Sequence, residues 1–215
     1  MKEYHKIEGL WKRDPETKKL IPGAYRNDAV GFLADFPWRF TEKVDGTNIR
    51  VVWDGHKVTF WGRTDNANIP TPLLRKLEEL FGGDVNEQIF EEHFGNKQVV
   101  LYGEGYGAKI QKGGGLYRKD NGFILFDVEI DGKMLAYEKL NGIALYFGIP
   151  VVPTVMIGKI IDAVEFVKGR PQSFVSEEPR EMEGLVGKPL IDLYDAAGNR
   201  LVVKVKVRDM EELGC

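Results

Sequence analysis

Apolar and polar residues alternate along several stretches of the chain, which is the pattern of strands with one buried face. The alternation predicts strands over residues 36–43, 48–53, 57–61, 101–107, 123–130 and 133–135. Turn residues separate two neighbouring pairs of these strands, namely Asp54-Gly55-His56 and Asp131-Gly132. Each of these pairs is expected to form a hairpin, so the sheets are predicted to be antiparallel.

Apolar residues at helical spacing predict three helices. The first covers residues 71–81, with Thr71 as its N-terminal cap and Pro72 in its first turn. The second is expected to begin at Asp84, which pairs with Glu87 as a capping box. The third covers residues 137–147 and ends at Gly148. Together, strands and helices predict a mixed α/β (α+β) fold in which antiparallel sheets are flanked by helices.

The last alternating stretch, residues 201–208, carries its charge on one face. Val203 and Val205 are expected on the buried face, and Lys204, Lys206 and Arg208 on the other. Successive lysines on one strand face lie about 7 Å apart, so two of them could hold one triphosphate. The alternative is an exposed edge strand whose lysines discourage aggregation.

Length and composition indicate one compact domain over residues 1–215, because 215 residues with 43% hydrophobic content can bury a sizeable core. No apolar stretch approaches the roughly 20 residues of a membrane span. The N-terminus lacks the apolar core of a signal peptide, so we expect a soluble cytoplasmic protein, in the host cytoplasm if it is viral. The single cysteine, Cys215, excludes a disulfide or a cysteine metal cluster within this chain.

The formal charge of −3 does not predict a surface that is basic as a whole, so any nucleic-acid contact must be local. Basic residues gather over residues 11–19 and over residues 109–119. Such runs are usually solvated faces. The second run is favoured as a functional flap because it follows Glu104 closely and contains Gly113-Gly114-Gly115.

Candidate chemistry centres on the segment Glu42-Lys43-Val44-Asp45-Gly46-Thr47-Asn48, which joins two predicted strands. Gly46 would let a phosphate approach the backbone, and Lys43 could act as a nucleophile. An amine with a pKa of about 10.4 is almost wholly protonated at pH 7, so positive neighbours or a dry pocket must depress it. Lys204 and Lys206 could supply that positive charge. The alternative is an ordinary hairpin turn at a solvated edge.

The rest of the chain supplies further polar residues in a definite order: Arg63, Glu104, Phe126-Asp127, Glu183-Gly184-Leu185-Val186-Gly187-Lys188, and Lys204-Val205-Lys206. With Lys43-x-Asp45-Gly46, this series resembles the covalent nucleotidyltransferases, which comprise ATP-dependent DNA ligases, RNA ligases and mRNA capping guanylyltransferases. Asn48 resembles the asparagine of RNA ligases of the RNA ligase 2 group, where DNA ligases usually have arginine. The resemblance implies an ATP-dependent RNA ligase.

The resemblance also implies a nucleotide pocket between two antiparallel sheets, ATP held as covalent AMP on Lys43, and Mg²⁺. It assigns Arg63 to a phosphate, Glu104 to the ribose and Phe126 to stacking on adenine. Glu183 is assigned to the metal, and Lys204 and Lys206 to phosphate. The implied catalytic residues are Lys43, Arg63, Lys188, Lys204 and Lys206; the implied nucleotide-binding residues are Glu42, Lys43, Asp45, Gly46, Asn48, Arg63, Glu104, Phe126, Glu183, Lys204 and Lys206.

Strand geometry adds two expectations about these motifs. Phe126 and Asp127 are neighbours on a strand and should point to opposite faces, so only Phe126 is assigned to the base. Glu183 and Lys188 lie five residues apart, so both can reach one site only if the chain bends, most plausibly at Gly187.

Two departures from the family pattern limit what the resemblance implies. Asp45 stands where close members of the RNA ligase 2 group often have histidine, which leaves end specificity open. The chain ends nine residues after Lys206, without the C-terminal domain that most ligases use to hold nucleic acid. Either the catalytic domain alone grips RNA with 5′-phosphate and 3′-hydroxyl ends, or a partner supplies the missing surface. A minimal DNA ligase, a capping enzyme and a non-catalytic nucleic-acid-binding module are the alternatives.

Overall fold

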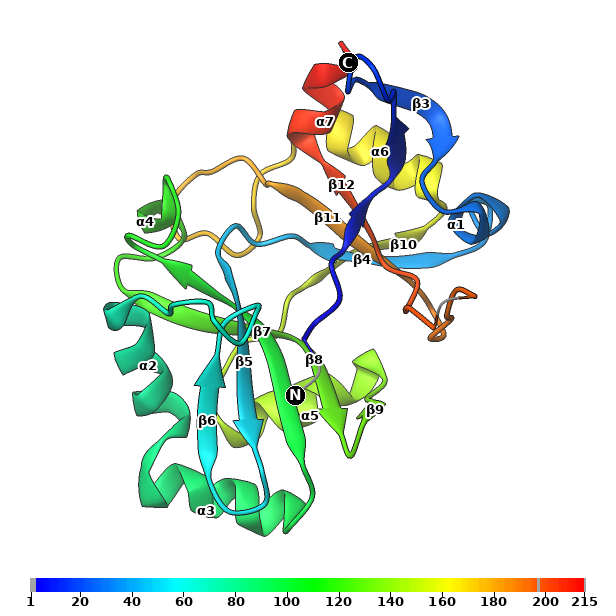
Figure 1. Ribbon diagram of the computed structural model, residues 1–215. Helices are drawn as coiled ribbons and strands as arrows, with labels where there is room; N and C mark the ends of the chain where they lie inside the picture. Colours follow the sequence, from blue (N-terminus) through cyan, green and yellow to red (C-terminus); the bar gives the residue numbers. More distant parts are fainter. Residues whose placement is uncertain (1–2, 197, 215) are drawn as a thin grey trace. The chain divides into compact units, whose positions relative to one another are not determined.

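The computed structural model describes residues 3–196 and 198–214, and the chain divides into two compact units (Figure 1). The first unit contains Asp45–Val152, Tyr4 and Ser176–Glu178. The second contains His5–Val44, Pro153–Val175 and the residues from Pro179 onward. Each unit has its own sheet and its own core. The chain passes from the second unit to the first between Val44 and Asp45, inside the predicted nucleophile motif.

The first unit is built on a five-stranded sheet with the order β6-β5-β7-β8-β9. Its strands are β5 (Thr47–Trp53), β6 (Val58–Trp61), β7 (Val99–Gly107), β8 (Asn121–Ile130) and β9 (Lys133–Met134). All neighbouring strands pair antiparallel, and the predicted hairpins β5–β6 and β8–β9 are confirmed. Asp131 and Gly132 have φ values of 48° and 76° at the β8–β9 turn, as a tight hairpin turn requires.

Helices cover one face of this sheet (Figure 1). They are α2 (Thr71–Phe81), α3 (Gly83–Phe94), and α5 (Leu140–Tyr146), which follows a 3₁₀ turn over Tyr137–Lys139; α4 (Gly114–Tyr117) is a short helix between β7 and β8. The core between sheet and helices includes Leu73, Leu77, Phe81, Phe90, Leu101, Phe123 and Leu125. The three predicted helices are therefore present.

The predicted caps of the first two helices are wrong. The N-cap of α2 is Pro70, so Thr71 and Pro72 are its first helical residues. Helix α3 begins at Gly83, and its N-cap has no side-chain hydrogen bond. Glu87 instead accepts a hydrogen bond of 3.0 Å from the backbone N–H of Val58 on β6. The Glu87 carboxylate, which the local sequence assigned to capping, therefore makes a tertiary hydrogen bond instead.

The second unit contains a five-stranded sheet with the order β1-β12-β11-β4-β10 (Figure 1). Its strands are β1 (Glu8–Gly9), β4 (Trp38–Glu42), β10 (Thr154–Gly158), β11 (Gly184–Pro189) and β12 (Val203–Lys206). Pairing is antiparallel except between β1 and β12, which are parallel. A separate hairpin joins β2 (Trp11–Arg13) to β3 (Leu20–Tyr25), and the helices are α1 (Asp28–Phe32), α6 (Ile160–Lys168) and α7 (Val207–Glu212).

The strand predicted over residues 201–208 is shorter than expected. It ends at Lys206, and α7 begins at Val207, so Arg208 lies on a helix. The cause is packing, because Val207 and Met210 are buried one helical turn apart in the core of this unit. Within β12 the predicted alternation is confirmed, since Val203 and Val205 lie in that core. Within the described part of the chain, no helix has the length and apolar content that would cross a bilayer.

Candidate active site

Lys43 follows directly after β4, and pairing to the neighbouring strand fixes its backbone. Its N–H donates to the carbonyl of Gly184, at the start of β11, over 2.9 Å. The strands on either side of the Lys43 motif, β4 and β5, belong to different sheets. The motif is therefore a crossover between sheets, and the alternative of an ordinary hairpin turn is excluded.

One carboxylate joins two lysines beside this strand end. Lys43 Nζ lies 2.6 Å from Glu183 Oε2, and Lys206 Nζ lies 3.1 Å from Glu183 Oε1. The side chains of Lys43, Glu183 and Lys206 are 23%, 20% and 10% exposed, so water screens these pairs less than at an open surface. Three residues that are far apart in the sequence thus converge at the edge of β11, as the motifs predicted. We call Lys43, Glu183, Lys204 and Lys206 the lysine cluster.

The charges of the lysine cluster act on one another. Burial alone would raise the pKa of Glu183, but the nearby ammonium groups of Lys43 and Lys206 outweigh it and lower the pKa. The pKa of Lys204 is lowered, first by burial and then by the positive charges of Lys206 and Lys43. An additional anion would be attracted to this cluster, because one carboxylate balances three ammonium groups.

Lys188 lies on the same face of the sheet as Lys204. The pairing places Thr41, Val186 and Lys204 side by side, and Lys188 is two residues beyond Val186 on β11. The predicted bend at Gly187 is wrong, because pairing with β4 continues without a shift to Pro189. The chain turns instead at Gly184, whose φ is 151° and whose added Cβ would lie 2.1 Å from the carbonyl oxygen of Val205. Glu183 therefore precedes β11, so the alternation of side chains along that strand does not fix the direction of the Glu183 side chain.

Glu42 faces the opposite side of the sheet from Thr41 and Lys43. Its pairing partner is Leu185, a core residue, and its side chain is buried. Its carboxylate accepts a short hydrogen bond from Ser173 Oγ and one of 2.7 Å from the backbone N–H of Phe174. Burial raises the pKa of Glu42, although these hydrogen bonds act in the other direction. Through these hydrogen bonds, Glu42 holds residues 173–174 against β4.

Replacement of Glu42 with alanine should destabilise the protein by about 2 kcal/mol in acid, because the Phe174 N–H would lose its acceptor. The folded-state pKa of Glu42 is raised, so its contribution is fully present below its unfolded pKa, about 4.3, and is lost as the pH rises through the folded value. Urea unfolding of wild type and Glu42→Ala should therefore differ more at about pH 4.5 than at about pH 8. A difference that increases with pH would contradict this placement.

The first unit presents a polar row on the sheet face away from its helices. Asn48 on β5 pairs with Glu104 on β7, and Arg50 pairs with Tyr102, which in turn pairs with Asp127 on β8. Directly paired residues share a face, so Asn48 and Glu104, both assigned to the nucleotide by the resemblance, are neighbours. The side-chain oxygen of Asn48 is buried and has no hydrogen-bond partner within the described residues. A buried acceptor without a donor is rare in folded proteins, so Asn48 is a candidate for a further polar contact.

A β-bulge changes the directions of Phe126 and Asp127. Tyr102 pairs with Asp127 and Gly103 with Leu125, so Phe126 is the extra residue on β8. The ring of Tyr4 lies edge-on to Phe126, with centroids 5.2 Å apart, and its hydroxyl donates to Asp127. Both residues therefore point to the side of Tyr4, and the expectation that they face opposite ways is wrong. Two residues of a bulge can oppose a single partner, which regular alternation does not allow.

The backbone of the predicted nucleophile motif is packed against two other parts of the first unit. A Cβ added at Gly46 would lie 2.3 Å from the carbonyl oxygen of Gly105, so glycine is required there by close contact with β7. From the segment that contains α4, Gln111 Nε2 donates to the Gly46 carbonyl over 3.0 Å. The buried Tyr117 hydroxyl accepts from the Asp45 N–H over 3.1 Å. The inner side of the predicted flap thus fixes the motif's backbone.

Arg50 is a buried residue next to the predicted site residue Arg63, and the sequence analysis missed it. It is fully buried, its Nε donates to the Gly62 carbonyl over 2.9 Å, and its Nη2 lies 2.7 Å from Asp65 Oδ1. These contacts bracket Arg63, which is exposed. The available signal was a charged residue between Ile49 and Val51 in an otherwise apolar strand. Arg50 thus positions the backbone that carries Arg63.

Replacement of Arg50 with methionine should leave the fold intact, because its ion-pair partner, Asp65, has a side chain that is 49% exposed and stays solvated once the guanidinium is gone. The segment over residues 62–67 should then exchange its amide hydrogens faster, since both anchoring hydrogen bonds are lost. If Arg63 contacts a phosphate as the resemblance implies, any nucleotide transfer should slow on the order of tenfold through misplacement of Arg63. Hydrogen–deuterium exchange and single-turnover rates test this expectation. Asp65→Asn is the milder variant, because it removes only the charge of Asp65 and leaves the hydrogen bond from Arg50 to the Gly62 carbonyl. Unchanged exchange in Arg50→Met would show that Arg50 does not hold this segment.

The acidic groups of the structure fit a metal held jointly with a nucleotide. Among the described residues, no group of three or more His, Cys, Asp and Glu side chains could hold a metal ion by itself. Glu183 supplies one carboxylate at the lysine cluster. Mg²⁺ usually keeps several waters and binds through one or two carboxylates plus phosphate oxygens. This donor set therefore fits magnesium only together with a bound phosphate compound.

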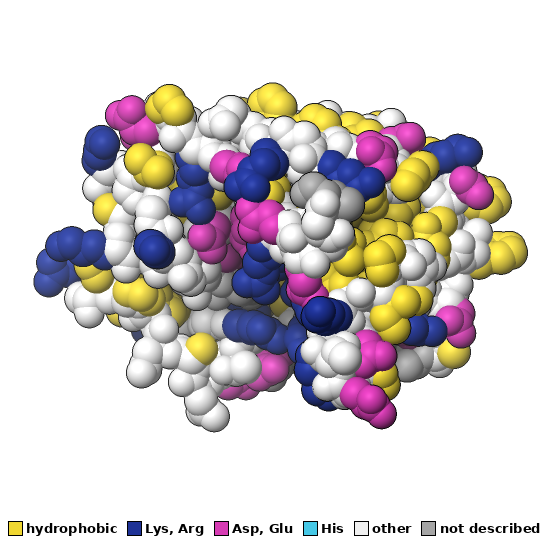
Figure 2. Space-filling view, turned by 90° about the horizontal axis from the view of Figure 1, so that it is seen from above, with side chains coloured by type: hydrophobic (Ala, Val, Ile, Leu, Met, Phe, Trp, Pro, Cys, Tyr) yellow, Lys and Arg dark blue, Asp and Glu magenta, His cyan; other side chains and the backbone are white. Residues whose placement is uncertain are grey.

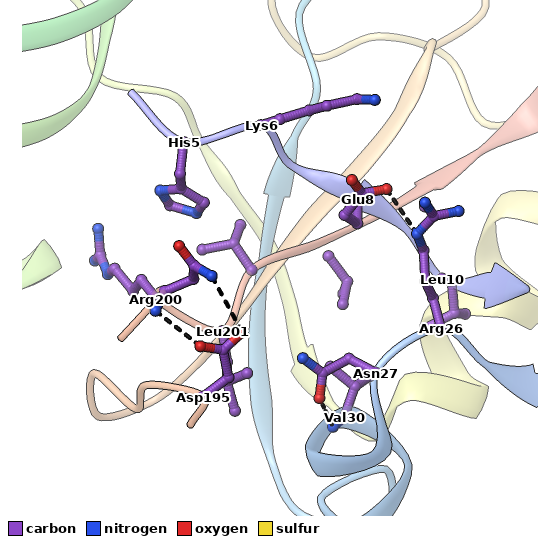
Figure 3. Close-up of a pocket in the computed structure, with 14 residues that line it drawn as sticks. His5, Lys6, Glu8, Leu10, Arg26, Asn27, Val30, Asp195, Arg200 and Leu201 are labelled. Carbon is purple, nitrogen blue, oxygen red and sulfur yellow. Dashed lines mark hydrogen bonds and ion pairs between the residues drawn. The ribbon is translucent and has the colours of Figure 1, made fainter. Parts of the chain in front are cut away.

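Charges of both signs are interspersed on the surface. On the face seen in Figure 2, Lys and Arg side chains lie among Asp and Glu side chains, as the formal charge of −3 leads one to expect. A cavity of about 390 Å³ lies at the β1 edge of the second unit, and its lining contains none of the predicted site residues (Figure 3). Arg26 in its wall is paired with Glu8, and its floor includes Leu10 and Val30. The predicted chemistry and this cavity are therefore separate features.

Comparisons with known proteins agree with the motifs. The sequence model of the RNA ligase family matches residues 36–206, whereas no curated protein sequence matches the chain. The fold is similar to that of a Naegleria gruberi RNA ligase mutant with AMP and Mn, with a TM-score of 0.65 at 16% identity over 97% of this chain and 61% of that chain. A second mutant of that ligase, with ATP and Mn, gives 0.61 at 16% identity over 98% and 63%. An archaeal ATP-dependent RNA ligase gives 0.64 at 17% identity over 97% and 49%.

These likenesses show the fold, and they confirm the predicted mixed α/β architecture. The chain spans between 49% and 63% of the lengths of these three solved structures. The expectation of a single domain over residues 1–215 stays a prediction, as do the roles of the individual site residues.

Proposed function

The chain belongs to the RNA ligase family, and we propose that it is an ATP-dependent RNA ligase that carries AMP on Lys43. The observation that supports this most strongly is the lysine cluster, in which Lys43 lies beside Lys206 across the single carboxylate of Glu183. Such a cluster provides a nucleophile together with positive charge for phosphates. The solved structures with ATP or AMP and Mn are of proteins with this fold.

In the first step, Lys43 Nζ attacks the α-phosphorus of ATP. A phosphorus–nitrogen bond forms, the bond from the α-phosphorus to the bridging oxygen breaks, and pyrophosphate leaves with the bonding pair. The amine must first lose one proton to solvent and give up its contact with Glu183, because its lone pair forms the new bond. The nitrogen loses a second proton to solvent once the bond has formed, which leaves a neutral phosphoramidate nitrogen. Lys204 and Lys206 would neutralise the charge that builds on the phosphates. Lys188, on the same sheet face, and Arg63 are proposed to contribute in the same way.

Residues of the first unit are proposed to hold the nucleoside. Glu104 can accept hydrogen bonds from both ribose hydroxyls. Phe126, the extra residue of the bulge, is proposed to stack its ring on the adenine base. Asn48, with its unpartnered side-chain oxygen, is proposed to bind a polar group of the nucleotide or its hydration shell. Asp45 and Gly46 would contribute through the backbone that Tyr117 and Gln111 hold in place.

Glu183 is the residue proposed to hold magnesium together with the nucleotide phosphates. When bound there, the ion would withdraw charge from the phosphate oxygens and so favour departure of pyrophosphate. Without a nucleotide, the Glu183 carboxylate balances the charges of Lys43 and Lys206. With ATP bound, the phosphates would balance those lysines, and Glu183 would be available to the ion.

The second and third steps transfer the AMP and seal the RNA. An oxygen of an RNA 5′-phosphate attacks the lysine-bound phosphorus, and the phosphorus–nitrogen bond breaks. The Lys43 nitrogen takes up one proton as it leaves and a second from solvent, which restores the ammonium group. The 3′-hydroxyl of a second RNA end then loses its proton and attacks the 5′-phosphorus, and AMP departs. The product is an ordinary phosphodiester.

A nicked RNA duplex with a labelled 5′-phosphate tests this function. With ATP and magnesium, we expect an adenylated strand followed by a sealed strand. The same duplex with a 3′-deoxy end at the nick is the matched control, because it lacks the attacking hydroxyl and should accumulate the adenylated strand. Sealing of a DNA nick but not of the RNA nick would move the protein to the DNA ligases. Absence of both RNA products would refute RNA ligation.

A further inference from the structure

A groove on the first unit carries basic side chains that the proposed nucleotide chemistry does not use. Helix α2 forms one wall, and the segment after β7, up to the start of β8, forms the other. Its volume is about 410 Å³. Four basic side chains line it, Arg75, Lys76, Lys109 and Lys119, against two acidic ones, Glu79 and Asp120. The groove is thus locally positive on a chain whose formal charge is −3.

The acidic residues of the groove are already engaged. Glu79 pairs with Lys76 over 2.7 Å, and Asp120 accepts two hydrogen bonds from Arg118. The guanidinium of Arg118 accordingly lowers the pKa of Asp120, which remains charged and paired at neutral pH. Asp120 is therefore not available to neutralise the other cations of the groove.

Lys119 lies 3.7 Å from Glu178, outside the groove, so Arg75 and Lys109 are the groove cations that remain. Both are exposed, and neither has an ion-pair partner within the described residues. They come from opposite walls, Arg75 from α2 and Lys109 from the segment after β7. Lys109 has a φ of 64°, which is uncommon for a residue other than glycine. Two unpaired cations facing one groove form an anion-binding surface.

The wall that carries Lys109 is joined to the nucleophile motif. Gln111 and Tyr117, from the same segment, make the hydrogen bonds to the backbone of Gly46 and Asp45 described above. Tyr117 is fully buried, and its ring packs edge-on to Tyr106, with centroids 5.9 Å apart. An anionic polymer bound at Lys109 would therefore lie on the same short segment that fixes the Asp45–Gly46 backbone.

We propose that this groove binds the phosphodiester backbone of the RNA substrate, a proposal that rests on the proposed ligase function. The ligand must be a polyanion that can contact both walls, because the two unpaired cations come from opposite sides of the groove. Arg75 can grip a phosphate through two N–H groups, and Lys109 offers a point charge to a second phosphate. Neither residue carries out chemistry, so both act on RNA affinity alone.

The test compares two double variants from which the same charge has been removed. Arg75→Gln with Lys109→Gln removes the unpaired groove cations. Lys97→Gln with Lys133→Gln removes two exposed lysines of the same unit that do not line the groove. Binding of a nicked RNA duplex with a 5′-hydroxyl end, which cannot be adenylated, is measured by fluorescence anisotropy without ATP over a range of salt concentrations.

We expect the groove variant to bind this RNA on the order of tenfold more weakly at low salt, with a shallower salt dependence, because about two counterion-releasing contacts are lost. The control variant should bind as wild type does. Equal affinity and equal salt slope in the two double variants would overturn the proposal. Formation of the AMP adduct from ATP, measured in parallel, should be the same in all three proteins. Absence of the adduct in wild type would refute the proposed function without deciding whether the groove binds RNA.

Discussion

Replacement of Lys43 with alanine is expected to abolish transfer of AMP to the protein, with a loss of more than about 10³-fold, because no other group can form the phosphorus–nitrogen bond at this position. The fold should persist, since the Lys43 side chain is partly exposed and contributes no core contact. Lys43→Arg is the matched variant. It keeps a positive charge beside Glu183, but a guanidinium does not deprotonate near neutral pH and cannot attack. Both variants should be inactive in this step.

Pre-adenylated RNA separates this defect from a general loss of function. The last step needs no free amine on Lys43, so the alanine variant should still seal an RNA whose 5′ end already carries AMP. Adduct formation in Lys43→Ala, measured by intact mass, would remove Lys43 from the mechanism. Loss of sealing with pre-adenylated RNA as well would show that the residue acts beyond the first step.

Replacement of Glu183 with glutamine is expected to slow AMP transfer on the order of 10²-fold or more, because the lysine cluster loses its only carboxylate and magnesium loses its proposed ligand. The variant leaves Lys43 and Lys206 without their common partner. Glu181→Gln is the control, because Glu181 pairs with Arg170 at the surface and lies outside the cluster. A Glu183→Gln rate within a few fold of the Glu181→Gln rate would contradict the proposed role.

The Glu183 variant should also show a distinct dependence on pH. The positive charges of Lys43 and Lys206 lower the folded-state pKa of Glu183 against the effect of burial. Its stabilising contribution is therefore present above its unfolded pKa, about 4.3, and is lost as the pH falls through the folded value. The stability difference between wild type and Glu183→Gln should shrink in acid, opposite in sign to the effect expected for Glu42→Ala. The pKa of Lys204, which Glu183 raises, should fall further in the variant.

Most strands and helices could be predicted because apolar spacing and turn residues, which are properties of the local sequence, determine them. The alternation at residues 48–53 and 57–61 and the turn between them are confirmed as β5 and β6. Helix α2 was predicted from its apolar spacing, with its last residue, Phe81, correct. Prediction failed where a distant contact decides the structure. Glu87 bonds to Val58 rather than capping its helix.

The motif residues were predicted by their resemblance to a family, whereas their geometry depends on pairing between distant strands. Nothing in the sequence shows that β4 and β5 belong to different sheets, or that β1 pairs parallel with β12. The bulge at Phe126 and the backbone conformation of Gly184 are single-residue departures from regular strands. The argument from alternation therefore misjudged the directions of Phe126 and Asp127, and it placed the expected bend before Lys188 at Gly187. Arg50 was missed because its partners, the Gly62 carbonyl and Asp65, reach it only through the β5–β6 pairing.

The central claim is that Lys43 carries AMP, and intact mass spectrometry of the purified wild-type protein tests it most directly. The protein is incubated with magnesium and ATP, and a parallel sample with GTP. The account predicts a gain of one AMP with ATP, located on the peptide that contains Lys43, and no gain with GTP. A gain with GTP alone would indicate a capping enzyme. A folded protein that gains no mass with either nucleotide would contradict the account.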